Sequence, residues 1–368
     1  MTPHAATATG GTHSPLQLLI VDVGHGNATI IRDGDCFALI DAGPETQTAH
    51  LDELNRLGCQ RVEHVVLSHA DADHIAGACL LLADYERTLG TFWYNSDGVK
   101  DSTTWARLLR MVHTRKRSGG LDYIEGLTAD GSRRPDFGRV EFEVTNPDSL
   151  LASHGPTPPN QRTGGSARPR LTSNSISIVL RVLFDGAPVA LLAGDLDSIA
   201  LKHVLAEERA MKAPILVFPH HGGLPGSGDA GAFAEDLTRA VEPTLVVFSM
   251  QGGGRYANPN PEIVAGVRRA APEAHIACTQ LSVHCCSKNF EAPAWHLANS
   301  HATGRETGRC CIGTVGVEST QEGLCYTPPL EVHQRFVTEV AMTPLCRAAF
   351  PIPQQKVRTR SAVSPRSS

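Results

Sequence analysis

The chain has 368 residues, of which 41% are apolar and 19% are charged. This length allows one large α/β domain or two ordinary ones, with enough apolar residues for a sizeable core. The formal net charge of −5 gives no reason to expect nucleic-acid or membrane binding through a global field. The N-terminus lacks a basic start and an apolar core, and the first apolar run is too short to cross a bilayer. We expect a cytoplasmic protein without membrane contact; its oligomeric state is not indicated.

The first part of the chain consists of short apolar runs rich in β-branched residues. Strands are predicted in LQLLIVDVG, NATIIR and CFALIDAG, and again in VEHVVLSH after the helical stretch TQTAHLDELNRLG. We expect disorder in residues 1–15, which are small and polar, and in the Pro/Arg/Ser tail 351–368.

A second series of alternating elements begins near residue 175. Strands are predicted in SISIVLRVLF, VALLAGD, PILVFPHH and TLVVFSM, and helices in DSIALKHVLAEERAMK, AFAEDLTRAV and PEIVAGVRRA. Residues from about 98 to 170 interrupt the pattern, with a helix near 104–116 and then a Gly/Pro-rich stretch interpreted as a loop or lid. The alternation of strands and helices predicts α/β layers.

Four potential metal ligands follow one predicted strand, in VVLSHADADHIAG. They are His69, Asp71, Asp73 and His74, and a helix is expected to begin near His74. At the carboxyl end of a strand the backbone turns, so alternate side chains can converge. The alternative is a capped helix start, with Asp71 or Asp73 as the N-cap and solvated histidines. Capping explains one aspartate and neither histidine, so we favour a metal site.

Two other predicted strands also end in possible ligands. Asp195 follows the strand in LLAGD, and His220 and His221 follow the strand in LVFPHH. Asp195 alone is equally well explained as the N-cap of the next helix, and a histidine in such a place is usually a satisfied core residue. Because chemistry in α/β sheets gathers at the carboxyl ends of strands, however, the three strand ends point to one crevice.

The motifs VDVGHGNATIIR, IDAG, SHADADHIAG, NSISIVLRV, LLAGDLD and FPHHGG occur in this order over roughly residues 16–280. In this they resemble the metallo-β-lactamase-like domain of the bacterial DNA-internalisation competence protein. The resemblance implies a four-layer αββα sandwich, a binuclear metal centre and hydrolysis of phosphodiester bonds. The resemblance assigns His69 and Asp71 to one metal, Asp73 and His74 to the other, and Asp195 to a bridging position between them. One of His220 and His221 would complete the ligand shell, and the other would face substrate. Asp22 and Asp41 would lie at the base of the site.

The chain departs from that family in two motifs. His25 and Asn27 stand where the family usually has Gln and Asp, and Asn258 precedes Pro259 where the family has His. The second change removes an imidazole that could contact substrate, so it bears on substrate identity more than on metal binding. The family's membrane-spanning portion is absent, so we do not expect DNA transport.

An aspartate-rich, sulfur-poor site makes Mn²⁺ a serious competitor of Zn²⁺. Two such cations would share a hydroxide that acts as the nucleophile. Asp73, His220 and His221 are the candidate catalytic residues, the histidines because they can stabilise an oxyanion or assist the leaving group.

Seven of the ten cysteines lie beyond residue 277, and six of these fall in residues 281–350, which we expect to form a Cys-rich extension. A structural zinc site near Cys278, Cys286 and Cys310 is one hypothesis. The spacing fits no standard zinc finger, and the alternative is a set of buried thiols in a final β-hairpin.

The substrate is less clearly indicated than the site. The basic runs 115–117 and 133–134 could contact the phosphates of a nucleic acid or nucleotide, although a solvated helical face is the commoner meaning of such charges. The first hypothesis is a nuclease or other phosphodiesterase. A hydrolase of a thioester or lactam is the second, and a catalytically idle binding module on the same fold is the third.

Overall fold

The structure is a computed structural model and describes residues 15–158, 170–253, 256–287, 290–320 and 322–347. Two expectations therefore lie wholly or largely outside the described residues: the disorder of the two ends, apart from residue 15, and the loop or lid over residues 153–170, of which residues 159–169 are not described. Within the described residues, no helix combines the length and apolar character needed to span a membrane.

The first six strands of the chain and the last two build an eight-stranded mixed sheet in the order β14-β13-β1-β2-β3-β4-β5-β6. The strands β3 to β6 run parallel to one another, and the remaining neighbours are antiparallel. The bounds are β1 (Leu16–Ile20), β2 (Ala28–Asp33), β3 (Cys36–Ala42), β4 (Arg61–Val66), β5 (Thr88–Tyr94), β6 (Asp122–Glu125), β13 (Val315–Thr320) and β14 (Gly323–Thr327).

The second half builds a six-stranded sheet in the order β12-β11-β10-β9-β8-β7. The strands β9 to β12 are parallel, while β7, β8 and β9 pair in antiparallel fashion. The bounds are β7 (Val140–Asn146), β8 (Val179–Phe184), β9 (Ala187–Leu192), β10 (Ile215–Val217), β11 (Leu245–Phe248) and β12 (His275–Cys278).

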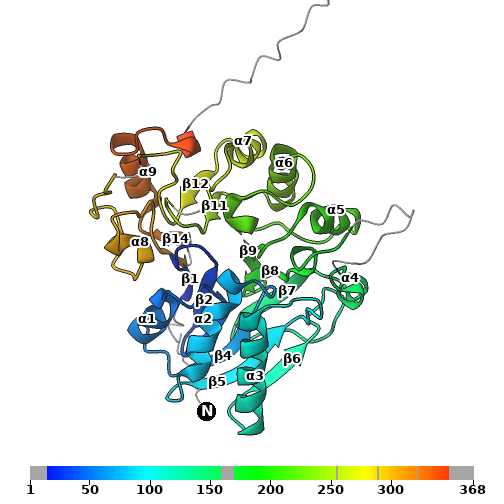
Figure 1. Cartoon of the computed structure of the whole chain (residues 1–368). Helices are drawn as coiled ribbons and strands as arrows, with labels where there is room; N and C mark the ends of the chain where they lie inside the picture. The colour runs from blue at the N-terminus through cyan, green and yellow to red at the C-terminus, as the bar shows by residue number, and fades with distance from the viewer. Residues whose placement is uncertain (1–14, 159–169, 254–255, 288–289, 321, 348–368) are drawn as a thin grey trace, which may run out of the picture.

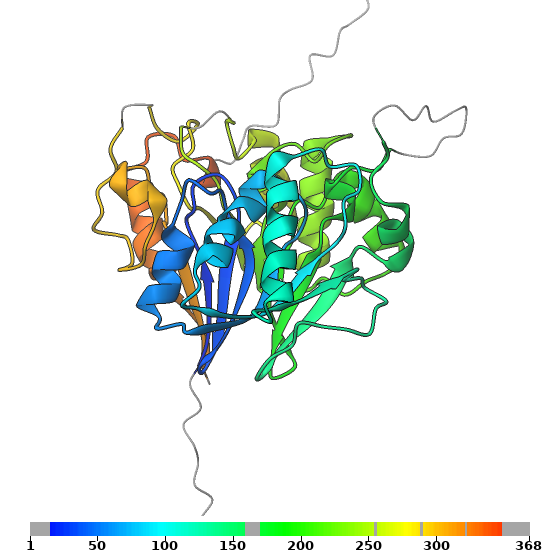
Figure 2. The same ribbon diagram turned by 60° about the horizontal axis from the view of Figure 1, so that its bottom comes forward.

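Helices cover the outer faces of the two sheets (Figures 1 and 2). The first sheet carries α1 (Ala49–Arg56), α2 (Ala72–Ala83) and α3 (Thr103–Arg117), and the second carries α5 (Ser198–Ala206), α6 (Ala230–Val241) and α7 (Pro261–Ala270). The other helical elements are α4 (Ser149–His154), α8 (Thr303–Glu306), α9 (Leu330–Glu339) and three 3₁₀ turns at Asn174–Ile176, Pro219–Gly222 and Leu345–Arg347.

Three separate hydrophobic cores show how the layers stack. Successive side chains of a strand point to opposite faces of its sheet. In β1, Ile20 packs into a core shared by both sheets, and its neighbour Leu19 packs under α1 to α3. In β9, Leu192 joins the core between the sheets, and Leu191 packs under α5 to α7. The layers are therefore helix, sheet, sheet, helix, which confirms the predicted αββα sandwich.

Two segments that the sequence set apart from this sandwich contribute strands to it. Residues from the expected insertion at 98–170 form α3 and the edge strands β6 and β7. Residues from the expected extension at 281–350 form β13 and β14, and β13 pairs with β1 in the register Leu18 to Val317. Both β13 and β1 bury apolar side chains in the core between the sheets, so the C-terminal region is part of the same packing unit.

The close approach of α2 to the end of β3 depends on Gly77. A Cβ at this position would meet the carbonyl oxygen of Ala42 at 2.0 Å and the His50 ring at 2.8 Å. Replacing an exposed helical glycine by alanine normally stabilises by about 0.5–1 kcal/mol. Here we expect Gly77→Ala to destabilise the protein by about 1–3 kcal/mol, because the helix must move off the sheet.

Urea unfolding of the full chain measures this effect. Gly98→Ala is the matched control, since a Cβ there meets nothing within 4 Å and we expect no loss of stability. A Gly77→Ala protein as stable as wild type would show that α2 can shift away from β3 at little cost.

Candidate metal centre

All the predicted ligands lie at one edge of the two sheets, where parallel strands end. His69 follows β4, Asp195 follows β9, and His220 and His221 follow β10. Because the sheets face each other, the ends of these strands bring the side chains together across the core. The expected convergence of three strand ends is present in the structure.

Neither Asp71 nor Asp195 caps a helix through its side chain, although the alternative interpretation of the sequence proposed that role. Asp71 occupies the N-cap position of α2, but its side chain makes no capping hydrogen bond. The helix α5 is capped by Asp197, whose carboxylate accepts hydrogen bonds from the amides of Ile199 and Ala200. Asp195 is therefore free of the capping role that its position suggested.

A buried group consists of His69, His74 and Asp195, and we call it the inner group. Their ligand atoms all lie within 4.8 Å of one another. Asp195 Oδ1 lies 3.3 Å from His74 Nε2, and Asp195 Oδ2 lies 3.6 Å from His69 Nε2. The side chains are at most 10% exposed, so a cation held here would be largely removed from solvent.

The orientation of the inner histidines is fixed from behind by Asp41 and Ser68. Asp41 Oδ2 lies 2.7 Å from His74 Nδ1, and Asp41 also accepts hydrogen bonds from the amide and hydroxyl of Ser68 at 2.7 and 2.8 Å. Ser68 Oγ is in turn 3.0 Å from His69 Nδ1. With Nδ1 engaged, each imidazole directs Nε2 toward Asp195.

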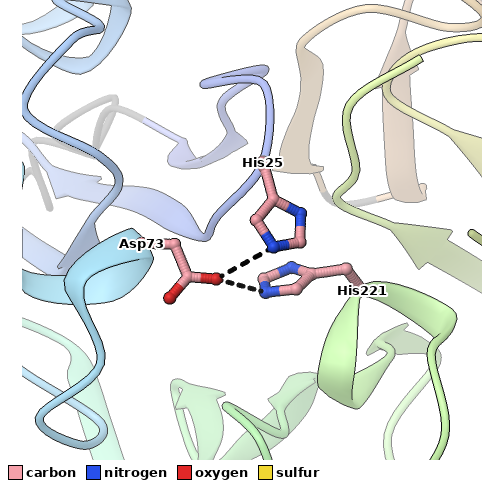
Figure 3. A group of neighbouring side chains, drawn as sticks. All are labelled: His25, Asp73 and His221. Atoms are coloured by element: carbon pink, nitrogen blue, oxygen red, sulfur yellow. Dashed lines mark ion pairs between the residues drawn. The ribbon is translucent and has the colours of Figure 1, made fainter. Parts of the chain in front are cut away.

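A second group, the outer group, consists of His25, Asp73 and His221 (Figure 3). Asp73 Oδ2 lies 3.3 Å from His25 Nε2 and 3.2 Å from His221 Nε2. His221 is oriented by a hydrogen bond from Nδ1 to the carbonyl oxygen of Ser249, at 2.8 Å. His25 and Asp73 are about one quarter exposed, so this group is more accessible than the inner one.

This grouping differs from the one that the resemblance implied. His74 lies with His69 rather than with Asp73, and His221, not His220, belongs to a group. The Asp71 carboxylate is ion-paired with Lys100 and lies 3.9 Å from His69 Nε2, outside both groups. The metal roles predicted for these residues remain predictions.

His25 was noted in the sequence only as a departure from the family pattern, not as a ligand. It lies in the loop between β1 and β2, and no feature of that loop alone shows that it reaches α2. The one available signal was its chemistry, since an imidazole stands where the family has an amide.

The charge states of the inner group are set by its burial and by mutual contacts. Burial lowers the pKa of His69 and acts in the same direction on His74, but the carboxylates of Asp195 and Asp41 raise the pKa of His74 well above its usual value. Burial raises the pKa of Asp195, but His74 and His220 hold it well below its usual value. Asp195 is thus an anion.

The outer group also pairs imidazoles with a carboxylate. Burial lowers the pKa of His25 to about 4, with a further contribution from His221. Burial raises the pKa of Asp73, but contacts with His221 and His74 lower it below its usual value. His25 is therefore neutral near pH 7 and Asp73 is ionised, the forms in which both side chains bind metals.

The donor atoms fit a divalent cation in each group. Among the described residues, the Nε2 atoms of His69, His74, His220 and His221 are buried and have no hydrogen-bond partner of good geometry. Carboxylates lie beside the Nε2 atoms of His69, His74 and His221. Unsatisfied buried nitrogens are costly unless something else engages them. Imidazole nitrogens and carboxylate oxygens are common ligands of Zn²⁺ and related ions.

Backbone strain accompanies the two adjacent histidines. His220 and His221 have φ angles of 53° and 55°, in the left-handed region that non-glycine residues rarely adopt. This turn directs His221 Nε2 to Asp73 and places His220 Nδ1 3.5 Å from Asp195 Oδ2. His220 therefore lies at the edge of the inner group without joining it.

Asp22, predicted at the base of the site, is fully buried and serves the backbone around it. Its carboxylate accepts hydrogen bonds from the amides of Gly24 and Gly304 and from the Gln280 side chain. Burial raises its pKa against these contacts. Asp22 thus ties the loop that carries His25 to the C-terminal region.

The cysteines proposed for a structural zinc site have separate surroundings. The Cys286 thiol lies 3.7 Å from the Ser282 carbonyl oxygen, and the Cys310 thiol lies 3.8 Å from Asp22. Cys278 packs in the core beneath α5 to α7. Among the residues that the structure describes, these three thiols do not gather into a ligand group, and each is buried like a small apolar side chain.

Comparison with known proteins agrees with this geometry. Residues 21–86, which include β2 to β4 and the motif from His69 to His74, match the family model described as the Metallo-beta-lactamase superfamily. Over this part of the chain the sequence is therefore similar to that superfamily, and the resemblance found in the sequence is confirmed.

The proteins that this chain resembles are distant from it in sequence. The competence protein ComA of Neisseria gonorrhoeae is 24% identical over 250 residues, which make up 67% of this chain and 29% of that protein. Among solved structures, the metallo hydrolase Igni18 from Ignicoccus hospitalis is 15% identical (TM-score 0.41, covering 71% of this chain and 94% of that one). The metallo-beta-lactamase fold protein YhfI from Bacillus subtilis is 11% identical (TM-score 0.43, covering 72% and 96%).

Proposed function

We propose that this protein is a phosphodiesterase, with a nucleic acid or nucleotide as its substrate, that works with two divalent cations. The observation that carries the proposal is the pair of ligand groups around one carboxylate. Asp195 Oδ1 lies 3.3 Å from His74 Nε2 in the inner group and 4.0 Å from His221 Nε2 in the outer group. Paired cations of this kind suit phosphoryl centres, where attacking and leaving oxygens both carry charge.

Bound cations would supply a hydroxide nucleophile near neutral pH and would offset charge on the attacked group. The inner group would hold one cation through His69, His74 and Asp195, and Asp73 and His221 would hold the other. His220 belongs to neither group, so its imidazole is available to face substrate and to donate a proton to the leaving oxygen. Asp41 and Ser249 orient the histidines from behind.

Lys100 supports an anionic substrate. The Lys100 ammonium is paired with Asp71, and the two side chains are 27% and 34% exposed beside the inner group. Within the basic runs suggested by the sequence, Lys116 pairs with Asp122, and Arg134 donates to the carbonyl oxygens of Arg133 and Ala129. We assign the contact with a phosphate oxygen to Lys100, because its partner Asp71 lies 3.9 Å from His69 Nε2.

The donor atoms of the two groups bear on the choice between Zn²⁺ and Mn²⁺. Each group offers two imidazole nitrogens and one carboxylate, a set that suits Zn²⁺ better than the aspartate-rich motif alone does. Asp71 would add the oxygen ligand that favours Mn²⁺ only on leaving Lys100. Both ions therefore belong in any assay.

A substrate panel tests the proposal. The full chain, loaded with Zn²⁺ or Mn²⁺, is incubated with single- and double-stranded DNA, RNA, cyclic dinucleotides and a thioester. We expect cleavage of at least one phosphodiester and its loss on chelation, because the nucleophile depends on bound metal. Chelated protein and metal alone are the controls.

Other outcomes of the same panel identify the alternatives. Turnover confined to the thioester would favour the carbonyl-hydrolase hypothesis, since the same fold can present a metal hydroxide to either class. Absence of bound metal in the purified and metal-supplemented protein would overturn the proposal and favour the idle binding module.

A further inference from the structure

We infer that His25 is a metal ligand and gives the outer cation a third protein donor, supplied by the loop between β1 and β2. This inference rests on the proposed metal centre and adds a residue that the family pattern does not provide. Without His25, Asp73 and His221 would hold the outer cation with only two donors from this group. Figure 3 shows the three side chains converging from separate elements.

Distance and direction support ligation. His25 Nε2 lies 3.3 Å from Asp73 Oδ2, and it falls with the Asp73 and His221 donor atoms within a span of 4.8 Å. The rings of His25 and His221 are tilted by 56°, with centroids 4.6 Å apart, and the Nε2 atoms of both rings lie near Asp73 Oδ2. A cation bound between them would use the Nε2 atom of each ring.

The loop that carries His25 is held closely against α2. A Cβ at Gly26 would meet the backbone oxygen of Asp73 at 2.2 Å, and the residue has a φ of 138°, so a glycine is required there. The carbonyl oxygen of Gly26 also accepts a hydrogen bond from the Ser249 hydroxyl at 2.7 Å. Ser249 therefore fixes both this loop and, through its own carbonyl, His221.

Tyr256 packs behind His25. The two rings are stacked, with centroids 5.0 Å apart and an angle of 26° between their planes. This contact limits rotation of the imidazole, and ordering a ligand before the cation arrives strengthens binding. His25 is thus restrained by its backbone on one side and by an aromatic ring on the other.

Metal binding by the full chain, after chelation and dialysis, tests the inference. Wild type is titrated with Zn²⁺ and with Co²⁺, and bound metal is measured directly. His25→Gln installs the residue usual in the family and is compared with His25→Ala. We expect two bound equivalents in wild type, and in both variants at least about tenfold weaker binding of one equivalent with the other unchanged. The visible absorption of the Co²⁺ ion bound at the outer group should also change, because that ion has lost an imidazole ligand.

The controls separate ligation from other roles of His25. His113→Gln removes an exposed histidine on α3 and should bind metal as wild type does. Equal thermal midpoints of the metal-free variants and metal-free wild type would show that the fold is intact. Unchanged affinities and spectra in both His25 variants would overturn the inference, even if activity fell, because His25 would then act on substrate. Failure of the proposed function would instead appear in wild type, as absence of metal binding.

Discussion

Replacing Asp195 by alanine is expected to remove metal from both groups and to lower phosphodiester cleavage by at least about 100-fold, comparable to the loss of a major charge-stabilising group. Asp195 is the carboxylate that lies beside the Nε2 atoms of both inner histidines, at 3.3 and 3.6 Å, and it also reaches His221 at 4.0 Å. Alanine leaves the inner group with two neutral donors and removes the anion between the groups.

Bound metal and activity are measured on the same sample. Asp236→Ala, an exposed aspartate on α6, is the matched control and should retain both metals. A second comparison uses Asp73→Ala, which belongs to the outer group alone and should lose one equivalent. If Asp195→Ala kept two tightly bound metals, the central position assigned to this carboxylate would be wrong.

Much of the fold was predictable because its signals are local. The apolar runs gave strands at β1 to β4 and β8 to β11, and the helical period near residues 104–116 corresponds to α3. The helix expected through residue 212 instead ends at Ala206. The contributions of β6, β7, β13 and β14 to the two sheets depend on long-range pairing, which leaves little trace in a short stretch of sequence.

The site, like the fold, has features that the sequence predicts locally and others that depend on long-range contacts. Strand ends located His69, Asp195 and His221 because a buried strand followed by a histidine or aspartate is visible in the sequence. The sequence does not show which ligands belong to which of the two groups. That division depends on how the loop of His25 meets α2 at the edge of the sheet. The pairing of Asp71 with Lys100 joins residues separated by a strand and a helix, and no periodicity reports it.

Asp41→Asn is expected to weaken metal binding at the inner group by about 10- to 100-fold, although Asp41 is not itself proposed as a ligand. Its carboxylate accepts from Ser68 and from His74 Nδ1. When a cation displaces the proton from Nε2, this contact keeps the remaining proton of His74 on Nδ1 and leaves the Nε2 lone pair to the cation. An asparagine that keeps its oxygen on the Ser68 amide turns its NH₂ group toward His74. The imidazole then accepts at Nδ1 and carries its proton on Nε2, where the cation would bind.

The substitution isolates this effect from backbone strain. Asp41 has a φ of 55°, which asparagine tolerates as well as aspartate does. Asp185→Asn is the matched control, because Asp185 has a similar φ of 49° and an exposed side chain, and we expect its metal affinity to equal that of wild type. Competition with a chelator of known affinity gives the two constants for each protein. Weaker binding of only the inner equivalent in Asp41→Asn would support orientation of His74 by the carboxylate, whereas wild-type affinity would mean that the packing around His74 holds its tautomer without Asp41.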